Sequence, residues 1–205
     1  MGAKRARQDD GPSDAGLGKP RRVRADAQRN IDSLLQSAKA VFASSGVDAP
    51  IREIAEKADV GIGTLYRHFP QRADLVAAVF RREIDACADA APVLAAKYAP
   101  GEALARWMQR YAAFIATKRG LASALHSGAA AVKTLPAYFE SRLLPALRGL
   151  LEAAASAGEM RRDVEPKELL NAIARLCMQA HRERAGHAER MVALIVDGLR
   201  FGAKR

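Results

Sequence analysis

The chain has 205 residues, 49% of them hydrophobic, and carries a formal net charge of +10. This length accommodates one sizeable helical domain or a small head joined to a larger body. No apolar run approaches the ~20 residues of a transmembrane helix and the first residues lack a secretory signal, so we expect neither a membrane span nor export. Cys87 and Cys177 lie far apart, which indicates a reduced, cytoplasmic protein rather than a disulfide framework.

The hydrophobic pattern predicts an all-α fold of about nine helices. Apolar residues recur three and four positions apart along most of the chain, whereas period-two alternation is rare. We expect an N-terminal three-helix head over residues 25–71, joined to a larger C-terminal helical bundle over residues 72–205. The positive charge is shared between these regions and therefore supports a polyanionic partner only weakly.

Residues 1–24 are rich in Gly, Pro, Asp, Lys and Arg and contain almost no large apolar side chains, so we expect a disordered basic tail. Lys19, Arg21, Arg22 and Arg24 cluster just before the first predicted helix. Such clusters are typical of arms that follow a minor groove or a phosphate backbone, which makes Arg24 a candidate DNA contact. The alternative is a solvated tail without a partner.

The first helix is expected from about Ala25 to Ser45, as a scaffold for the two helices that follow. Its apolar face carries Ile31, Leu34, Leu35, Ala38 and Phe42. Residues 51–72 then predict two short helices joined by a tight turn. The apolar face of the first short helix consists of Ile51, Ile54, Ala55 and Ala58, and Pro50 suits its first turn.

The second short helix is expected over residues 62–69, with Pro70 ending it. Asp59 is tolerant of the left-handed conformation that the preceding turn requires, and Gly61 is the expected N-cap. Leu65 and Phe69 are four residues apart and point toward the head. The remaining surface of this helix is therefore rich in hydrogen-bonding groups.

This arrangement is typical of a helix-turn-helix, in which the second helix enters the major groove and the first crosses the backbone. We expect Arg67 to bind guanine, and Thr64 to meet a thymine methyl group or a phosphate. Tyr66 and His68 have polar tips suited to phosphate oxygens, and Gly63 permits a close approach. The alternative is an ordinary solvated helix on a bundle.

Two arginines outside the second short helix are expected to clamp the DNA backbone. Arg52 lies in the first short helix, and Arg72 opens the helix that follows the motif. Both would bind phosphates and carry no sequence information.

The segment GIGTLYRHFPQRADL resembles the signature of the TetR family of bacterial transcription regulators. The resemblance extends back through NIDSLLQSAKAVFASSGVDAPIREIAEKADV and so covers residues 30–75. Asp59 stands where the family usually has Gly, and Gly61 where a capping Ser is common. Both residues can adopt the required conformations, but one capping hydrogen bond is lost. The resemblance implies a homodimeric repressor that leaves a roughly palindromic DNA operator when an unknown small-molecule effector binds.

A longer fourth helix is expected from near Gln71 until Pro92 interrupts it, as the mechanical link between head and body. The following segment, residues 102–118, places Trp107, Tyr111 and Phe114 on one face. Such a stripe is usually core, but cavities that bind small molecules also favour aromatic walls.

Two further residues are candidate ligand contacts. His126 and Met178 complete the predicted ligand set with Trp107, Tyr111 and Phe114. For His126, hydrogen-bonded packing beside apolar neighbours is the alternative.

The last two helices are expected from Pro166 to about Arg184 and from Ala188 to Phe201. Their wide apolar faces predict a four-helix dimer interface with a second copy, although they could instead close the monomer's own bundle. The candidate interface residues are Leu169, Ile173, Leu176, Leu194, Ile195 and Leu199. The body from LARWMQRYAAFIATKRGL to LIVDGLR resembles an Ala-rich branch of TetR-like ligand domains, which implies an architecture without identifying a ligand.

No motif supports catalysis. Cys177 and His181 have the i, i+4 spacing of metal ligands, but no further ligands lie at a complementary spacing. The GIG at residues 61–63 is neither a dinucleotide fingerprint nor a phosphate loop. We therefore expect no enzyme, no metal and no cofactor. The function predicted is DNA-binding transcription regulation, and the alternative is a ligand-independent architectural DNA-binding protein.

Overall fold

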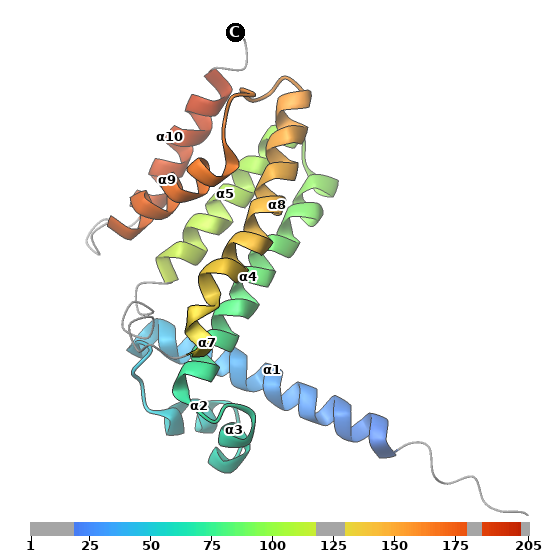
Figure 1. Cartoon of the computed structure of the whole chain (residues 1–205), viewed down its shortest axis with the longest axis vertical. Coiled ribbons are helices and arrows are strands. Elements are labelled where there is room, and N and C mark those ends of the chain that lie inside the picture. Colours follow the sequence, from blue (N-terminus) through green and yellow to red (C-terminus); the bar gives the residue numbers. More distant parts are fainter. Residues whose placement is uncertain (1–18, 118–129, 180–185, 202–205) are drawn as a thin grey trace, which may run out of the picture.

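A computed structural model describes residues 19–117, 130–179 and 186–201 of the chain (Figure 1). Over these ranges the protein is built from helices and contains no strand, which confirms the all-α prediction. None of the described helices is long and apolar enough to cross a bilayer.

The helices divide into a small head and a larger body (Figure 1). The head contains α1 (Lys19–Ser45), α2 (Ile51–Lys57) and α3 (Ile62–His68). The body contains most of α4 (Arg72–Lys97), then α5 (Pro100–Thr117), α7 (Ala130–Lys133), α8 (Leu135–Ser156), α9 (Pro166–Gln179) and α10 (His187–Phe201). The long helices α4, α5 and α8 pack side by side, and α9 and α10 cover α5 on one side.

Each part has its own apolar core. Buried residues from α1 to α4 form the head core, with Leu34, Ala38, Val41, Ile54, Ala55, Ala58, Leu65, Phe69, Leu75 and Val79 among them. The predicted supporting face of the first helix is therefore confirmed, since Leu34 and Ala38 are buried and Ile31, Leu35 and Phe42 pack against them. The body core is larger and is centred on α4, α5 and α8.

Helix α4 belongs to both cores. Leu75 and Val79, in its first turns, complete the head core, whereas Phe80, Ile84 and Cys87 are buried in the body core. Because one continuous helix carries both sets, its position in the body fixes where the head core lies.

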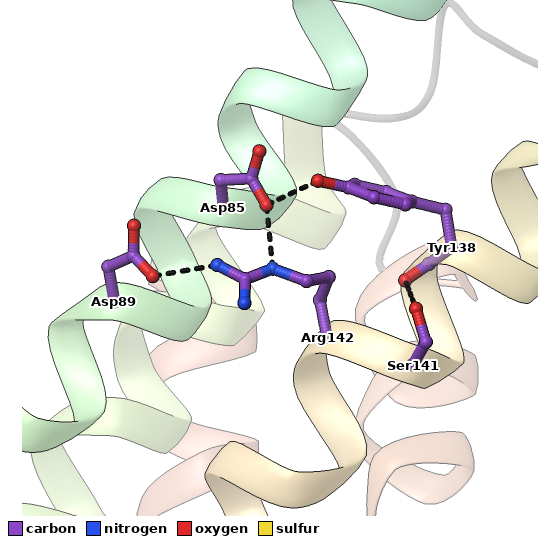
Figure 2. Close-up of polar contacts among 5 residues, drawn as sticks. All are labelled: Asp85, Asp89, Tyr138, Ser141 and Arg142. Carbon is purple, nitrogen blue, oxygen red and sulfur yellow. Dashed lines mark hydrogen bonds and ion pairs between the residues drawn. The ribbon is translucent and has the colours of Figure 1, made fainter.

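Polar side chains join α4 to α8 halfway along α4 (Figure 2). Asp85 accepts a hydrogen bond of 2.6 Å from the Tyr138 hydroxyl and one of 2.8 Å from Arg142 Nε. Arg142 Nη2 also donates to Asp89, one turn further along α4, at 2.8 Å. We call these four residues the α4–α8 clasp. Arg142 spans a full turn of α4, so the clasp fixes how α4 is aligned along α8.

Two predicted boundaries differ from the structure. Helix α1 begins at Lys19 rather than near Ala25, because Pro20 suits a first helical turn and the following Arg and Ala residues favour helix. Pro92 does not interrupt α4, which continues to Lys97. The Pro92 ring lies on the exposed side, while Ala88 and Ala91 remain packed in the body core, so tertiary packing overrides the local cost of proline.

Candidate DNA-binding site

The turn between α2 and α3 sets the geometry of the site. Helix α2 ends in a Schellman motif, in which the Val60 amide donates to the Ala55 carbonyl at 3.1 Å and the Asp59 amide donates to the Glu56 carbonyl at 3.1 Å. Asp59 has a φ of 54°, the left-handed conformation expected of it. This turn redirects the chain within the four residues between the end of α2 and the start of α3.

Gly61 is the N-cap of α3, as predicted, with extended backbone at φ −63° and ψ 140°. No side chain caps this end of the helix. At the other end, Phe69 leaves the helical conformation with φ −132° and ψ 82°, as expected for a residue that precedes proline. Helix α3 is therefore a short rod with a defined start and end.

One side of this rod is fixed in the head core. Leu65 and Phe69 are buried among residues of α1 and α4, which confirms their predicted direction. Because the inward side is fixed, the outward side has a defined orientation.

The outward side carries most of the predicted contact residues. Tyr66 is 48% exposed. Arg67 and Gly63 are exposed as well, whereas Thr64 and His68 are half-buried. Neither Tyr66 nor Arg67 hydrogen-bonds another described residue. The His68 ring lies 6.4 Å from that of Phe69, a contact that the sequence did not indicate.

Ile62 was missed by the sequence analysis. It is the first residue of α3 and is 43% exposed, next to Tyr66 on the following turn. A large apolar side chain at the leading end of a recognition helix can contact a thymine methyl group. The signal in the sequence was its position directly after the N-cap, where the helix first enters a groove.

The flanking arginines have different surroundings. Arg52 lies exposed in the first turn of α2. Arg72 is half-buried and its Nη1 atom donates to the carbonyls of Val47 and Ala49, both at 2.7 Å. Arg24 lies within α1, and its side chain is outside the described part of the chain.

Comparison with known proteins agrees with this geometry. The family model described as "Bacterial regulatory proteins, tetR family" matches residues 34–79. The one described as "Transcriptional regulator SbtR-like, C-terminal domain" matches residues 99–201. The TetR transcriptional regulator SCO0520 from Streptomyces coelicolor is 36% identical, with 83% of this chain and 98% of that chain covered and a TM-score of 0.72.

The chain belongs to the TetR family. It is therefore a DNA-binding transcription regulator. A TetR transcription regulatory protein from Mycobacterium vanbaalenii is 38% identical, with 87% and 99% of the two chains covered and a TM-score of 0.69. An HTH-type transcriptional regulator from Staphylococcus aureus is 36% identical over 64 residues, so the match covers 31% of this chain and 35% of that relative's length.

In this TetR protein the three aromatic residues predicted to contact a ligand, all on α5, lie in the core of the body. Trp107 and Tyr111 are buried, and their rings stack with centroids 5.7 Å apart. Trp107 Nε1 donates to the Cys87 carbonyl at 2.9 Å, and the Tyr111 hydroxyl donates to the Leu170 carbonyl at 3.2 Å. Burial raises the pKa of Tyr111 above its usual range, with Cys87 and Cys177 contributing. Both polar tips thus bind backbone, which favours the packing interpretation of these two residues.

Of the other predicted ligand contacts, only the Phe114 side chain lies in the described part of the chain. Phe114 is buried, with its ring 6.3 Å from that of Phe139. His126 and the side chain of Met178 lie outside the described part of the chain. A surface cleft of about 440 Å³ lies elsewhere, between the end of α8 and the segment leading into α9. It is lined by charged residues such as Arg148, Glu152 and Arg162, and by none of the predicted ligand contacts.

The predicted dimer residues fall into two groups. Leu169, Ile173 and Leu199 are buried within the chain itself, so they close the monomer's bundle and have almost no surface left for a partner. Leu176 and Ile195 are half-buried. Leu194 is 63% exposed, and Phe201, which the sequence analysis did not include, is 83% exposed. The apolar surface that α9 and α10 leave exposed is therefore narrower than predicted.

No group of three His, Cys, Asp or Glu residues that could hold a metal occurs among the described residues.

Proposed function

We propose that the protein is a repressor that binds as a homodimer to a roughly palindromic operator and releases it when a small-molecule effector binds the body. The observation that carries this proposal is the outward face of α3. Tyr66 and Arg67 stand exposed on a short helix whose opposite side, at Leu65 and Phe69, is fixed in the head core. A rigid helix presented in this way is suited to the major groove.

Base recognition is assigned to Ile62, Thr64 and Arg67 on the exposed part of α3. Arg67 donates two hydrogen bonds to guanine, Thr64 contacts a thymine methyl group or a phosphate, and Ile62 contacts a thymine methyl group. Gly63 allows the backbone to approach, since an added Cβ there would meet no atom within 4 Å and the surface beside it is open. Ile62 lies one turn before Tyr66, so the two line one edge of the contact surface.

Backbone contacts are assigned to residues around this core. Tyr66 and His68 donate to phosphate oxygens, and Arg52 meets a phosphate from the first turn of α2. Arg24 on α1 is proposed to reach a flanking phosphate. Such contacts add affinity for any sequence and make binding depend on salt.

Dimerisation gives the operator its symmetry. A two-fold dimer places its two α3 helices in successive major grooves, ~34–36 Å apart, or wider if the dimer is splayed. The exposed side chains of Leu194 and Phe201 on α10 support a contact with a second copy. In such an arrangement α9 and α10 of both copies form a four-helix interface.

The effector acts by changing the distance between the two heads. It must bind one dimer geometry more tightly than the other, and α4 carries the difference because it belongs to both cores. The effector site is proposed beside Phe114, with His126 and Met178 as further contacts. A regulator of this kind works in the cytoplasm, where it meets DNA.

Selection of bound duplexes from a random DNA pool tests the proposal. We expect one enriched inverted repeat whose half-sites have the spacing of the two α3 helices. Binding without an enriched sequence would instead support the alternative, a ligand-independent architectural DNA-binding protein. One observation favours this alternative: Trp107 and Tyr111 use their polar groups in hydrogen bonds to backbone carbonyls, which leaves fewer polar groups in the body for a ligand. A screen of small molecules against the enriched duplex then tests effector release.

A further inference from the structure

Arg72 is the first residue of α4, but its side chain contacts the segment between α1 and α2. Its Nη1 atom donates to the carbonyls of Val47 and Ala49, 25 and 23 residues earlier in the chain, at 2.7 Å each. Both carbonyls belong to the segment that joins α1 to α2. One guanidinium nitrogen therefore ties the start of α4 to the start of α2.

The tied segment lies where the two apolar cores meet. The Val47 side chain is buried in the body core, and the Ala49 side chain two residues later is buried in the head core. Helix α2 begins at Ile51, directly after this segment and Pro50. A shift of Val47 and Ala49 would therefore move the first turn of α2.

The electrostatics of the position indicate a specific role for the arginine. A cation in the first turn of a helix faces the positive end of the helix dipole, which is unfavourable. The two carbonyl oxygens compensate for this with charge-assisted hydrogen bonds. A lysine would supply the charge and enough N–H donors, but its Nζ lies on a shorter side chain and cannot reach as far as Nη1 does.

The position of α2 in turn determines the position of α3. The Schellman turn ties α3 to α2 through the bond from the Val60 amide to the Ala55 carbonyl, and the burial of Leu65 holds α3 against the head core. The chain of contacts therefore runs from Arg72 through the segment before α2 to the exposed face of α3.

We propose that Arg72 is a positioning residue, which holds the helix-turn-helix at a fixed angle to α4 by hydrogen bonds to Val47 and Ala49, rather than a phosphate contact. This inference rests on the proposed recognition of bases by α3. Base contacts depend on the placement of α3, whereas binding to arbitrary DNA depends mainly on neutralised phosphates. The loss of Arg72 therefore affects the preferred sequence more than other sequences.

The test compares Arg72→Met with Arg52→Met, a matched control in which the arginine is exposed and assigned to phosphate. Two probes are used: the duplex that the wild-type protein enriches from a random pool, and a scrambled duplex of equal length. Affinity for each is measured over a series of salt concentrations, at a temperature where circular dichroism shows every variant to be folded.

For Arg72→Met we expect affinity for the enriched duplex to fall by about tenfold, the equivalent of ~1.4 kcal/mol, with little change on the scrambled duplex. The slope of log K against log salt should stay at the wild-type value. For Arg52→Met both duplexes should lose affinity alike, and the slope should decrease in magnitude by about 0.9 for each protomer, or about 1.8 for the dimer.

Arg72→Lys keeps the test decisive if Arg72→Met does not fold. The positioning role predicts that Arg72→Lys binds the enriched duplex more weakly than the wild type and more tightly than Arg72→Met, because the shorter lysine side chain holds its Nζ further from the two carbonyls. A phosphate contact predicts that Lys retains the wild-type affinity and slope.

Three results would overturn the inference. Equal losses on both duplexes with a reduced slope would make Arg72 a phosphate contact. Unchanged affinity in a folded Arg72→Met protein would mean that the two hydrogen bonds serve only stability. If the wild-type protein enriches no duplex, the proposed recognition of bases by α3 is wrong, and the positioning role that rests on it is wrong as well.

Discussion

At the scale of single residues, α3 separates side chains that hold the helix from side chains that face outward. Leu65 is buried in the head core, while Arg67, two residues later, is exposed. The two functions fall on opposite sides of one short helix, so an outward residue can be replaced with little effect on stability.

Arg67→Ala tests the proposed guanine contact. We expect preference at one position of the operator to relax by ~1–3 kcal/mol, because a bidentate pair with guanine is lost, while the thermal midpoint stays close to the wild-type value. Repeating the duplex selection with the variant measures this. An unchanged motif would show that Arg67 does not read a base.

Gly61→Ser tests the missing cap. The backbone at Gly61 already has the extended conformation of an N-cap, and an added Cβ would lie 3.9 Å from Thr64 Oγ1, an ordinary contact. A serine hydroxyl should accept an amide hydrogen bond from the first turn and raise the free energy of unfolding by a few tenths of a kcal/mol, roughly 0.3. Urea denaturation measures the change, with Gly61→Ala, which adds a Cβ but no acceptor, as the control.

At the scale of helices, α4 is the element that organises the molecule, and the α4–α8 clasp determines its alignment. Asp85 accepts bonds from both Tyr138 and Arg142, and the bond from Tyr138 raises the pKa of that phenol above its usual value. The same helix is tied to the head through Arg72 at its first residue. Its position is thus specified at two points along its length.

Asp85→Asn tests the clasp. Neutralising the shared acceptor weakens two charge-assisted bonds, so we expect the free energy of unfolding to fall by about 1 kcal/mol. The control is Glu140→Gln, which removes the charge from an exposed pair with Lys167 at 3.2 Å and should cost less than about 0.5 kcal/mol. If both variants lose the same free energy of unfolding, the clasp stabilises the protein no more than an ordinary exposed ion pair does.

At the scale of the whole molecule, α10 leaves two large apolar side chains exposed in the single chain, and the proposed dimer would cover them. Leu194 and Phe201 are seven residues apart, two turns along one helical face, and both are largely exposed. Ile173 and Leu199, which the sequence analysis predicted at the interface together with Leu194, are buried inside the same chain.

Leu194→Glu tests this face. A carboxylate in the centre of an apolar contact would have to be desolvated, so we expect the dimer to dissociate and affinity for a palindromic duplex to fall with it. Sedimentation velocity measures the mass. Val93→Glu is the control, since Val93 is 65% exposed on α4 and is not assigned to the interface. A dimer that survives Leu194→Glu unchanged would place the contact elsewhere.

The sequence by itself determined the elements of the head. Spacings of three and four residues, the proline after α3, and Asp59 and Gly61 in the turn are local signals, because helix periodicity and backbone preference act over a few residues. They identified the helix-turn-helix and its outward face with boundaries close to those observed.

Only the tertiary structure decided which partner each side chain meets. An apolar stripe on α9 or α10 has the same pattern whether it faces its own chain or another, and only the packed bundle buries Ile173 and leaves Leu194 exposed. Arg72 could be assigned to a phosphate from its position, but its hydrogen bonds to Val47 and Ala49 depend on bringing together residues more than twenty positions apart. Contacts of that range follow from how helices pack, which local spacing does not specify.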